Sequence, residues 1–281
     1  MIIRNNISAI NTSRNQKIGR GAMNKSLEKL SSGFRINRAG DDAAGLAISE
    51  LMRHQINGLK QAERNVTDGI GLAQTADGAL TEIHSMLDRM KTLALEAANG
   101  TYSTDARAAL DLERVELLDE FDRIAGATDF NDIALFESEN LPANIDPPQE
   151  ADKITLQIGP SQDELLDVNR YYLGSKALLL DQTDFTGIDK ANDSITIIDN
   201  AIQAVSDMRG SLGAAQNHLE HTHNSLSVTE ENMTSAESRI RDTNMAEQVT
   251  AFTKEKIVME ASQSMLSQSV SVPQSILNLL K

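Results

Sequence analysis

A heptad repeat of apolar residues runs through the second half of the chain. Between residues 198 and 240 one apolar residue returns every seven positions without a break. This pattern is typical of a helix whose buried seam faces another helix. A helix of this length extends roughly 65 Å, so it requires a partner of similar length. The repeat positions are Ile198, Val205, Leu212, Leu219, Leu226, Met233 and Ile240.

The first half of the chain supplies such a partner. The same period begins at Leu59 and continues to Ala94. Two long heptad segments separated by about a hundred residues predict an antiparallel rod within one chain. The predicted fold is therefore mainly α, an elongated antiparallel helical bundle or coiled-coil rod. The positions are Leu59, Val66, Ala73, Leu80, Leu87 and Ala94, with Ala76, Ile83 and Met90 between them.

The composition agrees with long helices and excludes several classes of protein. The chain of 281 residues has 3% aromatic residues, no Trp and five Pro, which does not suit a globular enzyme core. It has no Cys, so it lacks a disulfide framework, a thiolate metal site and a thiol nucleophile. No apolar run approaches the roughly 18 residues of a membrane span, and no apolar secretory segment begins the chain. We therefore expect neither a membrane protein nor a general secretory substrate.

Three helices and a β-hairpin are expected before the helix that carries the heptad repeat of residues 198–240. Residues 3–36 repeat apolar side chains with helical spacing, and Asp41 and Asp42 suit the N-cap and first turn of the next helix. That helix is expected over 43–99, with a third helix ending near Gly126. Region 128–186 gathers Pro and contains two alternating runs, which predict a small β-hairpin. The runs are Lys153 to Ile158 and Leu165 to Tyr172.

Both terminal segments have unusual charge. Residues 1–40 contain eight Lys or Arg against the single Glu28, so they carry +7 of a total charge of −15. Residues 261–280 contain no charged residue. Each segment has one apolar side, so we expect them to pair with each other. Two thin helices bury little surface, and we therefore expect both to be disordered in the monomer and to order on association.

The basic segment of residues 1–40, called the leader below, also fits other partners. An acid-poor amphipathic segment is typical of an organelle transit peptide or a membrane-surface helix. A nucleic-acid interface needs basic surface with stacking aromatic side chains, and the leader has one aromatic residue, Phe34. We expect no nucleic acid and no membrane as partner, because the opposite terminus offers the leader a matching apolar side.

The candidate chemical sites have structural explanations. His218 and His221 are neighbours on a helix, but His223 is turned away from both, so we expect no metal. Gly69 and Gly71 lie inside the heptad pattern rather than after a strand, so they are not a dinucleotide loop. With no nucleophile, acid or base grouped by spacing, we expect no enzyme and no cofactor.

Several motifs resemble bacterial flagellin. They are IRNNISAINTSRN near the start, LSSGFRINRAGDDAAGLAIS from Leu30, RIAGATDFN from Arg123, LGAAQNHLEHT from Leu212, AESRIRDTNMAEQ from Ala236 and VPQSILNLLK at the end. They occur in the family's order and spacing, over about 80% of the chain. The resemblance implies an extracellular subunit that polymerises into the helical filament used for motility.

The resemblance also implies a domain organisation. Residues 1–42 and 241–281 would form a discontinuous inner-core coiled coil, and 43–240 an outer-core rod with the hairpin near 128–186. The variable outer region of the family is almost missing. The side chains expected to be buried by assembly are Ile3, Ile7, Leu27, Leu30, Phe34, Met265, Leu266, Ile276, Leu277 and Leu280. We further expect Ser262, Ser264, Gln268 or Ser271 to face a central channel.

Partners follow from the same resemblance. Flagellins pass unfolded through the flagellar type III apparatus, a chaperone holds the C-terminal helix, here roughly Met245 to Lys281, and hook-associated and cap proteins adjoin the filament. A Toll-like receptor senses a patch that falls on Arg89, Leu93 and Glu113, and an Arg among apolar contacts suits a binding hot spot. Leu93 could instead pack between the rod helices.

Three rival functions remain. A hook-filament junction protein has similar termini but would not polymerise on seeds. A metalloprotease on this scaffold would use the histidine cluster, although the chain lacks an HExxH motif. A coiled-coil membrane-surface protein would use residues 1–40.

Overall fold

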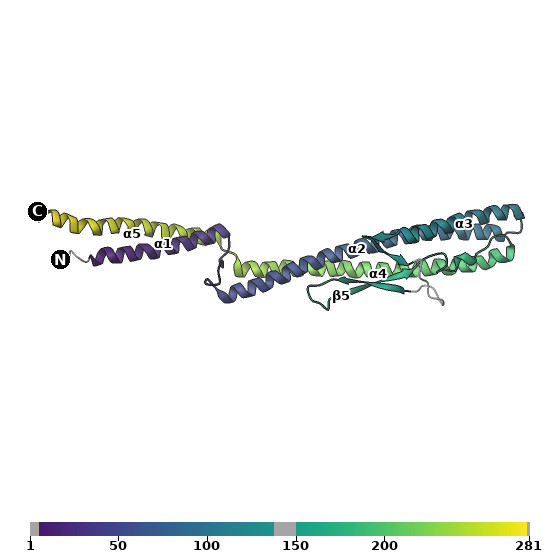
Figure 1. The fold of residues 1–281 in the computed structure, drawn as a ribbon, viewed down its shortest axis with the longest axis horizontal. Coiled ribbons are helices and arrows are strands. Elements are labelled where there is room, and N and C mark those ends of the chain that lie inside the picture. Colours follow the sequence, from purple (N-terminus) through teal and green to yellow (C-terminus); the bar gives the residue numbers. More distant parts are fainter. Residues whose placement is uncertain (1–5, 138–149, 280–281) are drawn as a thin grey trace. The chain divides into compact units, whose positions relative to one another are not determined.

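The computed structural model describes residues 6–137 and 150–279, and these residues fold mainly as α-helices (Figure 1). The predicted mainly α fold with a small β-hairpin is confirmed. The helices are α1 (Ile7–Ser32), α2 (Ala43–Ala98), α3 (Thr104–Ala127), α4 (Ile188–Arg241) and α5 (Met245–Leu279), with a short 3-10 helix η1 (Leu180–Gln182) before α4.

Local chemistry explains where the helices begin and end. Helix α1 stops at Gly33, whose φ of 76° is left-handed and whose N–H donates to the Lys29 carbonyl at 2.9 Å. Helix α2 begins after Asp42, whose Oδ1 accepts from the Gly45 N–H at 2.9 Å. The neighbouring Asp41 accepts instead from the main chain of the preceding turn, described below. Asp42 therefore caps α2, as the sequence indicates, whereas Asp41 does not cap this helix.

Helices α2 and α4 are antiparallel, as their heptads predict. Residue numbers fall along α4 as they rise along α2, and cross-helix ion pairs join the two. Their nitrogen–oxygen distances are 3.4, 2.8 and 2.6 Å. In order along α2 the pairs are Lys60–Glu230, Asp77–Arg209 and Lys91–Asp199.

The two heptad seams are buried to different extents. Every predicted seam position of α2, from Leu59 to Ala94, is buried. On α4 the seam is buried from Ile198 to Leu219 and only half-buried at Leu226, Met233 and Ile240. The core that covers the α4 seam as far as Leu212 also contains side chains from α3, β5 (Leu165–Tyr172) and the segment 173–185. The seam is thus best covered where more than two elements meet.

The β structure consists of two small sheets. Strands β1 (Asp129–Phe130) and β2 (Ile133–Ala134) pair antiparallel across Asn131 and Asp132, whose φ values of 53° and 63° are left-handed. A three-stranded sheet has the order β3–β5–β4, with β3 (Phe136–Glu137) parallel to β5 and β4 (Glu150–Gln157) antiparallel to it. The predicted hairpin is β4–β5; the β1–β2 hairpin is an addition that the sequence analysis missed.

Glycines in α2 allow the β4–β5 hairpin to lie close to the helix. A Cβ added at Gly69 would lie 2.5 Å from Leu156 Cδ1 of β4, and one at Gly58 would lie 3.0 Å from Pro160 Cβ in the hairpin turn. Asn65 Nδ2 donates to the Gln157 carbonyl at 3.0 Å between these two positions. The glycine that opens the GIG triplet therefore serves packing, which agrees with its exclusion as a cofactor loop.

The chain divides into two compact units. The terminal unit comprises residues 1–56 and 231–281, and the rod unit comprises residues 57–230. Both terminal segments belong to one unit. The division lies inside α2 and α4, so the start of α2 and the end of α4 belong to the terminal unit.

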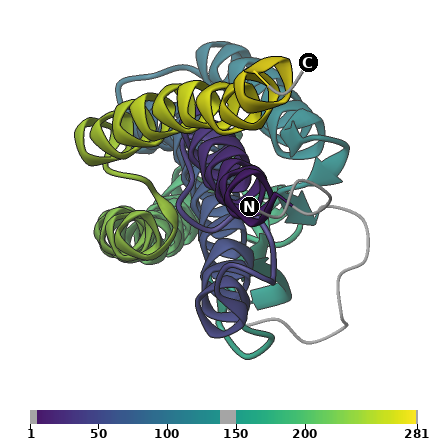
Figure 2. The same cartoon turned by 90° about the vertical axis from the view of Figure 1, so that its left-hand side faces the viewer.

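Within the terminal unit, α1 and α5 lie side by side (Figures 1 and 2). Asn6 Nδ2 donates to the Ser269 carbonyl at 2.8 Å, and Gln16 Nε2 donates to Gln263 Oε1. The start of α1 therefore lies beside the last third of α5, so the two helices run antiparallel. Several large apolar side chains of both helices are exposed.

Candidate functional site

The terminal unit exposes apolar side chains along both of its terminal helices. Exposed residues include Ile10 and Ile18 on α1 and Val249, Ile257 and Val270 on α5. Among the predicted assembly residues, Ile7, Leu27 and Met265 are exposed, and Leu30, Phe34 and Leu266 are half-buried. The other four lie outside the residues whose side chains are described: Ile3, Ile276, Leu277 and Leu280.

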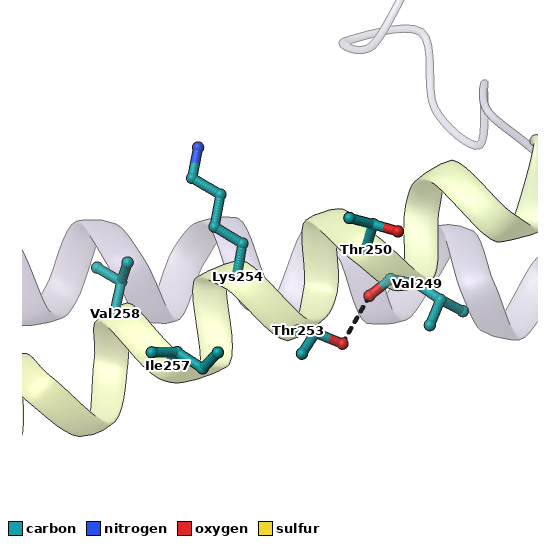
Figure 3. Close-up of a pocket in the computed structure, with 6 residues that line it drawn as sticks. All are labelled: Val249, Thr250, Thr253, Lys254, Ile257 and Val258. Carbon is teal, nitrogen blue, oxygen red and sulfur yellow. Dashed lines mark hydrogen bonds between the residues drawn. The ribbon is translucent and has the colours of Figure 1, made fainter.

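A shallow surface depression on α5 illustrates this exposure. Consecutive turns of the one helix line it, and its apolar side chains Ile257 and Val258 lie to one side of Lys254 (Figure 3). Thr253 Oγ1 donates back to the Val249 carbonyl at 2.8 Å, so this hydroxyl is already satisfied within the helix. The full lining is Val249, Thr250, Thr253, Lys254, Ile257 and Val258.

These exposed residues favour association. Full burial of one Val, Leu or Ile side chain contributes about 1.5–3 kcal/mol, and contiguous exposed apolar surface on a soluble protein marks an interaction site. No helix in the described part of the chain is both long enough and apolar enough to cross a membrane.

A clamp of main-chain hydrogen bonds joins the α1–α2 linker to the break between α4 and α5. Phe34 and Asp242 form an isolated antiparallel bridge. The Arg35 N–H donates to the Arg241 carbonyl at 2.6 Å, and the Thr243 N–H donates to the Gly33 carbonyl at 2.9 Å. Two segments about 200 residues apart in sequence are thereby held as a short two-stranded contact.

The side chain of Arg241 completes this clamp. Its Nη1 donates to Glu50 Oε1 at 2.6 Å, and its guanidinium carbon lies 4.9 Å from the centroid of the Phe34 ring. The hydrogen bond from Arg241, and secondarily its charge and that of Arg53, lower the pKa of Glu50 below its ordinary value. Arg241 therefore ties α2, α4 and the linker together.

Asp41 shapes the linker itself. Its Oδ2 accepts from the main-chain N–H of Arg38 at 3.2 Å and of Asn37 at 3.3 Å. These two hydrogen bonds, the Arg38 bond first, lower the pKa of Asp41. Through Oδ2 the carboxylate thus holds the turn before α2.

The proposed receptor residues are placed differently from one another. Arg89 on α2 and Glu113 on α3 form an ion pair, with Arg89 Nη2 at 2.6 Å and Nε at 2.8 Å from Glu113 Oε1. Both side chains are about half exposed, whereas Leu93 is fully buried. Arg89 and Glu113 are therefore accessible at the surface of the rod unit, and Leu93 packs in its core.

The histidine cluster does not converge. His218 and His221 are exposed on α4, and His223 Nε2 lies 3.5 Å from Glu63 Oε1 on α2. Throughout residues 6–137 and 150–279, no three His, Cys, Asp or Glu side chains come together as metal ligands.

Two buried arginines of α3 were missed by the sequence analysis. Arg107 donates from Nε to the Ala97 carbonyl at 2.8 Å and from Nη2 to the Asn99 carbonyl at 3.2 Å, so it caps the end of α2. Arg114 pairs with Asp111 at 2.7 Å and lies 5.6 Å from the Phe185 ring centroid. The signal in the sequence was an arginine at a core-facing position of the helix. A buried charge requires partners, so such an arginine indicates a structural contact.

Comparison with known families identifies both halves of the chain. The family model of the bacterial flagellin N-terminal helical region matches residues 3–140, and that of the bacterial flagellin C-terminal helical region matches residues 195–280. A flagellin of Halalkalibacterium halodurans is 46% identical and a flagellin of Bacillus subtilis is 42% identical. Each alignment covers 100% of this chain and 100% of the relative.

Solved structures agree with these matches. The crystal structure of Bacillus cereus flagellin has a TM-score of 0.51 and 32% identity, covering 62% of this chain and 94% of that chain. A putative flagellar hook-associated protein from Vibrio parahaemolyticus has a TM-score of 0.59, covers 72% of this chain and 100% of its own, and is 12% identical. The second match is a likeness of fold alone.

Proposed function

The chain belongs to the bacterial flagellin family, whose members are structural subunits of the extracellular flagellar filament, and we propose that its exposed terminal helices drive polymerisation. The observation that carries the proposal is the row of outward-facing apolar side chains on α1 and α5. A subunit that offers different complementary surfaces on its two sides forms heterologous contacts, and a rotation that does not close yields a helical filament.

Ordering of the termini is coupled to subunit addition in this mechanism. Residues 1–42 and 241–281 form an inner-core domain that is disordered in the free monomer, and 43–240 form the outer-core rod. The pairing of α1 with α5 through contacts such as Asn6 to Ser269 supports the inner-core assignment. Amide exchange on dilute monomer tests it: slow exchange throughout both terminal segments would contradict coupled ordering.

Assembly is tested by seeded elongation followed by electron microscopy. Monomer from heated filaments, cooled with short seeds, is expected to extend the seeds. Ile257→Ser should slow extension because Ile257 is exposed in the monomer and would be buried by a neighbouring copy. Leu112→Ser is the matched control, since Leu112 is also exposed but lies on α3 of the rod unit. Equal rates for the two variants would argue against the terminal helices.

Export and its chaperone belong to the same proposal. The subunit crosses the flagellar type III apparatus unfolded, and an export chaperone binds α5 before assembly. The apolar depression from Val249 to Val258 supports this, since a chaperone could cover it. Hook-associated and cap proteins are the neighbours proposed at the filament ends. A chaperone that binds full-length chain and Ile257→Ser with the same affinity would contradict a site at this depression.

Receptor recognition is proposed at Arg89 and Glu113. These side chains come from two helices and are partly exposed, whereas Leu93 supports the surface from the core. Arg89→Ala should weaken binding of the Toll-like receptor that senses flagellin, and Arg123→Ala is the control because Arg123 forms a similar exposed pair with Glu120. Equal receptor affinity of wild type and Arg89→Ala would overturn the site.

The alternative function is a hook-filament junction adaptor. The likeness of fold to a hook-associated protein is compatible with it, and full-length identity to flagellins favours the filament subunit. The seeded assay separates the two functions, because an adaptor would add once and not elongate.

A further inference from the structure

We propose that Asn99 is a site of spontaneous covalent modification, in which its side-chain amide is lost and aspartate or isoaspartate forms. The chain has two Asn–Gly pairs, Asn57–Gly58 and Asn99–Gly100. The main-chain nitrogen that follows an asparagine can attack the side-chain amide carbon. Glycine favours this attack because it has no Cβ to shield the nitrogen or restrict the backbone.

The two pairs lie in different backbone environments. Asn57 lies inside the long helix α2, whereas Asn99 and Gly100 follow its last residue, Ala98, in the turn before α3. A helix holds ψ at about −42°, and each interior N–H donates a hydrogen bond to the carbonyl four residues earlier. The Gly58 nitrogen therefore cannot reach the Asn57 side chain unless the helix opens. The Gly100 nitrogen, by contrast, lies beyond the last residue of α2.

Contacts in the turn favour the reaction at Asn99. The Thr101 N–H donates to Asn99 Oδ1 at 3.3 Å. This hydrogen bond turns the side-chain amide toward the following main chain, which carries the attacking nitrogen, and polarises the amide carbon. Both Asn99 and Gly100 are exposed, and a Cβ added at Gly100 would meet no atom within 4 Å. Water and hydroxide can therefore reach the reacting atoms.

The reaction balances with water as its only co-reactant. The Gly100 nitrogen gives its proton to hydroxide and bonds to the Asn99 side-chain carbonyl carbon. The bond from that carbon to the amide nitrogen breaks, the nitrogen takes a proton from water and leaves as ammonia, which regenerates the hydroxide, and a five-membered succinimide remains. Water then opens the ring at the side-chain carbon to give aspartate, or at the main-chain carbon to give isoaspartate.

Arg107 makes the isoaspartate product compatible with the fold. Ring opening at the main-chain carbon turns the Asn99 carbonyl oxygen into a carboxylate oxygen. Arg107 Nη2 already lies 3.2 Å from that oxygen, and Arg107 is buried and held by the Ala97 carbonyl. A hydrogen bond to a carboxylate is stronger than one to a neutral carbonyl. The new charge thus forms beside a fixed cation.

The test is peptide mapping of the full-length monomer after incubation at mildly alkaline pH, with mass spectrometry that separates isoaspartate. Asn99 is expected to convert at least about tenfold faster than Asn57, the factor that corresponds to about 1.4 kcal/mol of helix opening. In denaturant the two sites should convert at similar rates, which would attribute the difference to structure rather than to local sequence.

Gly100→Ala is the matched variant. It has open space for its Cβ, so the fold should be unchanged. Conversion at Asn99 should slow at least about tenfold, again about 1.4 kcal/mol, with conversion at Asn57 unaffected. Equal conversion of the two sites in the native protein, or conversion at Asn99 that Gly100→Ala leaves unchanged, would overturn the proposal.

Discussion

Arg241 Nη1 donates a hydrogen bond to Glu50 Oε1 at 2.6 Å, and this contact joins the end of α4 to the start of α2. The same guanidinium lies over the Phe34 ring, so it also holds the linker after α1. Helices α1 and α5 are connected to the rest of the terminal unit through these segments. Arg241 is therefore placed to control how firmly the linkers are held.

Glu50→Gln should loosen the linkers. The variant keeps the shape of the side chain but loses the charge that pairs with Arg241. In assembled filaments, where the terminal segments are ordered, hydrogen exchange should quicken at the Arg35 and Thr243 amides, which donate across the clamp. Glu120→Gln is the control, because Glu120 pairs with Arg123 on a single helix and joins no second segment. Unchanged exchange at both amides would show that the main-chain contacts suffice without the ion pair.

The same clamp predicts a dependence on pH. The pKa of Glu50 is lowered in the folded state, mainly by the hydrogen bond from Arg241. Its stabilising effect is therefore present above the ordinary glutamate pKa and is lost as pH falls through the folded-state pKa. Exchange at Arg35 should accelerate in this acid range more in wild type than in Glu50→Gln. Identical acid responses would exclude Glu50 as the titrating group.

Asp184→Asn should destabilise the junction before α4. Asp184 accepts from Lys190 Nζ at 2.6 Å and from the Thr186 N–H at 2.8 Å, and these contacts, Lys190 first, lower its pKa strongly. Loss of a hydrogen bond of this kind costs about 1 kcal/mol, measurable by thermal unfolding at neutral pH. The difference from wild type should shrink in acid, as Asp184 becomes protonated. Asp193→Asn, at an exposed position of α4, should have almost no effect.

Leu93→Ala and Arg89→Ala should separate stability from recognition. Leu93 is fully buried, so its truncation should cost about 2–5 kcal/mol in denaturant unfolding. Arg89 forms a half-exposed ion pair, so its truncation should cost less than about 1 kcal/mol. A small effect of Leu93→Ala on unfolding would contradict its place in the core.

Gly78→Ala and Gly69→Val should change stability in opposite directions. A Cβ at Gly78 meets no atom within 4 Å, so alanine should stabilise α2 by about 0.5–1 kcal/mol. Gly69 faces Leu156 and Leu219, so valine should overpack the hairpin and cost about 1–3 kcal/mol. Denaturant unfolding of the rod unit within the full chain measures both changes. A stabilising Gly69→Val would mean that the hairpin can move away freely.

Ser264→Lys tests the proposed central channel. Ser264 belongs to the uncharged end of the chain, and a lysine there should shorten filaments in growing cells by retaining charged segments of the passing chain. Ser225→Lys, at an exposed position of α4, is the control. Normal filament length in Ser264→Lys would contradict the proposal that neutral side chains line the channel.

The periodic features of the sequence determined the helices and their pairing. A seven-residue repeat fixes which side of a helix is apolar, and two such repeats of similar length must cover each other, so α2 and α4 were predictable as an antiparallel pair. Asp42 was predictable as a cap because its chemistry acts within one turn. The alternating runs likewise predicted the β4–β5 hairpin.

Tertiary structure alone decided features that depend on residues far apart in sequence. The burial of Leu93, the partners of Arg107 and the clamp formed by Arg241 and Glu50 require knowledge of which surfaces meet. From the local sequence, Gly69 is simply a residue that destabilises a helix. The close approach of Leu156 in the folded chain explains why a glycine is needed there. Local periodicity reports one face of one element at a time, whereas packing depends on pairs of faces, and that pairing is a property of the folded chain.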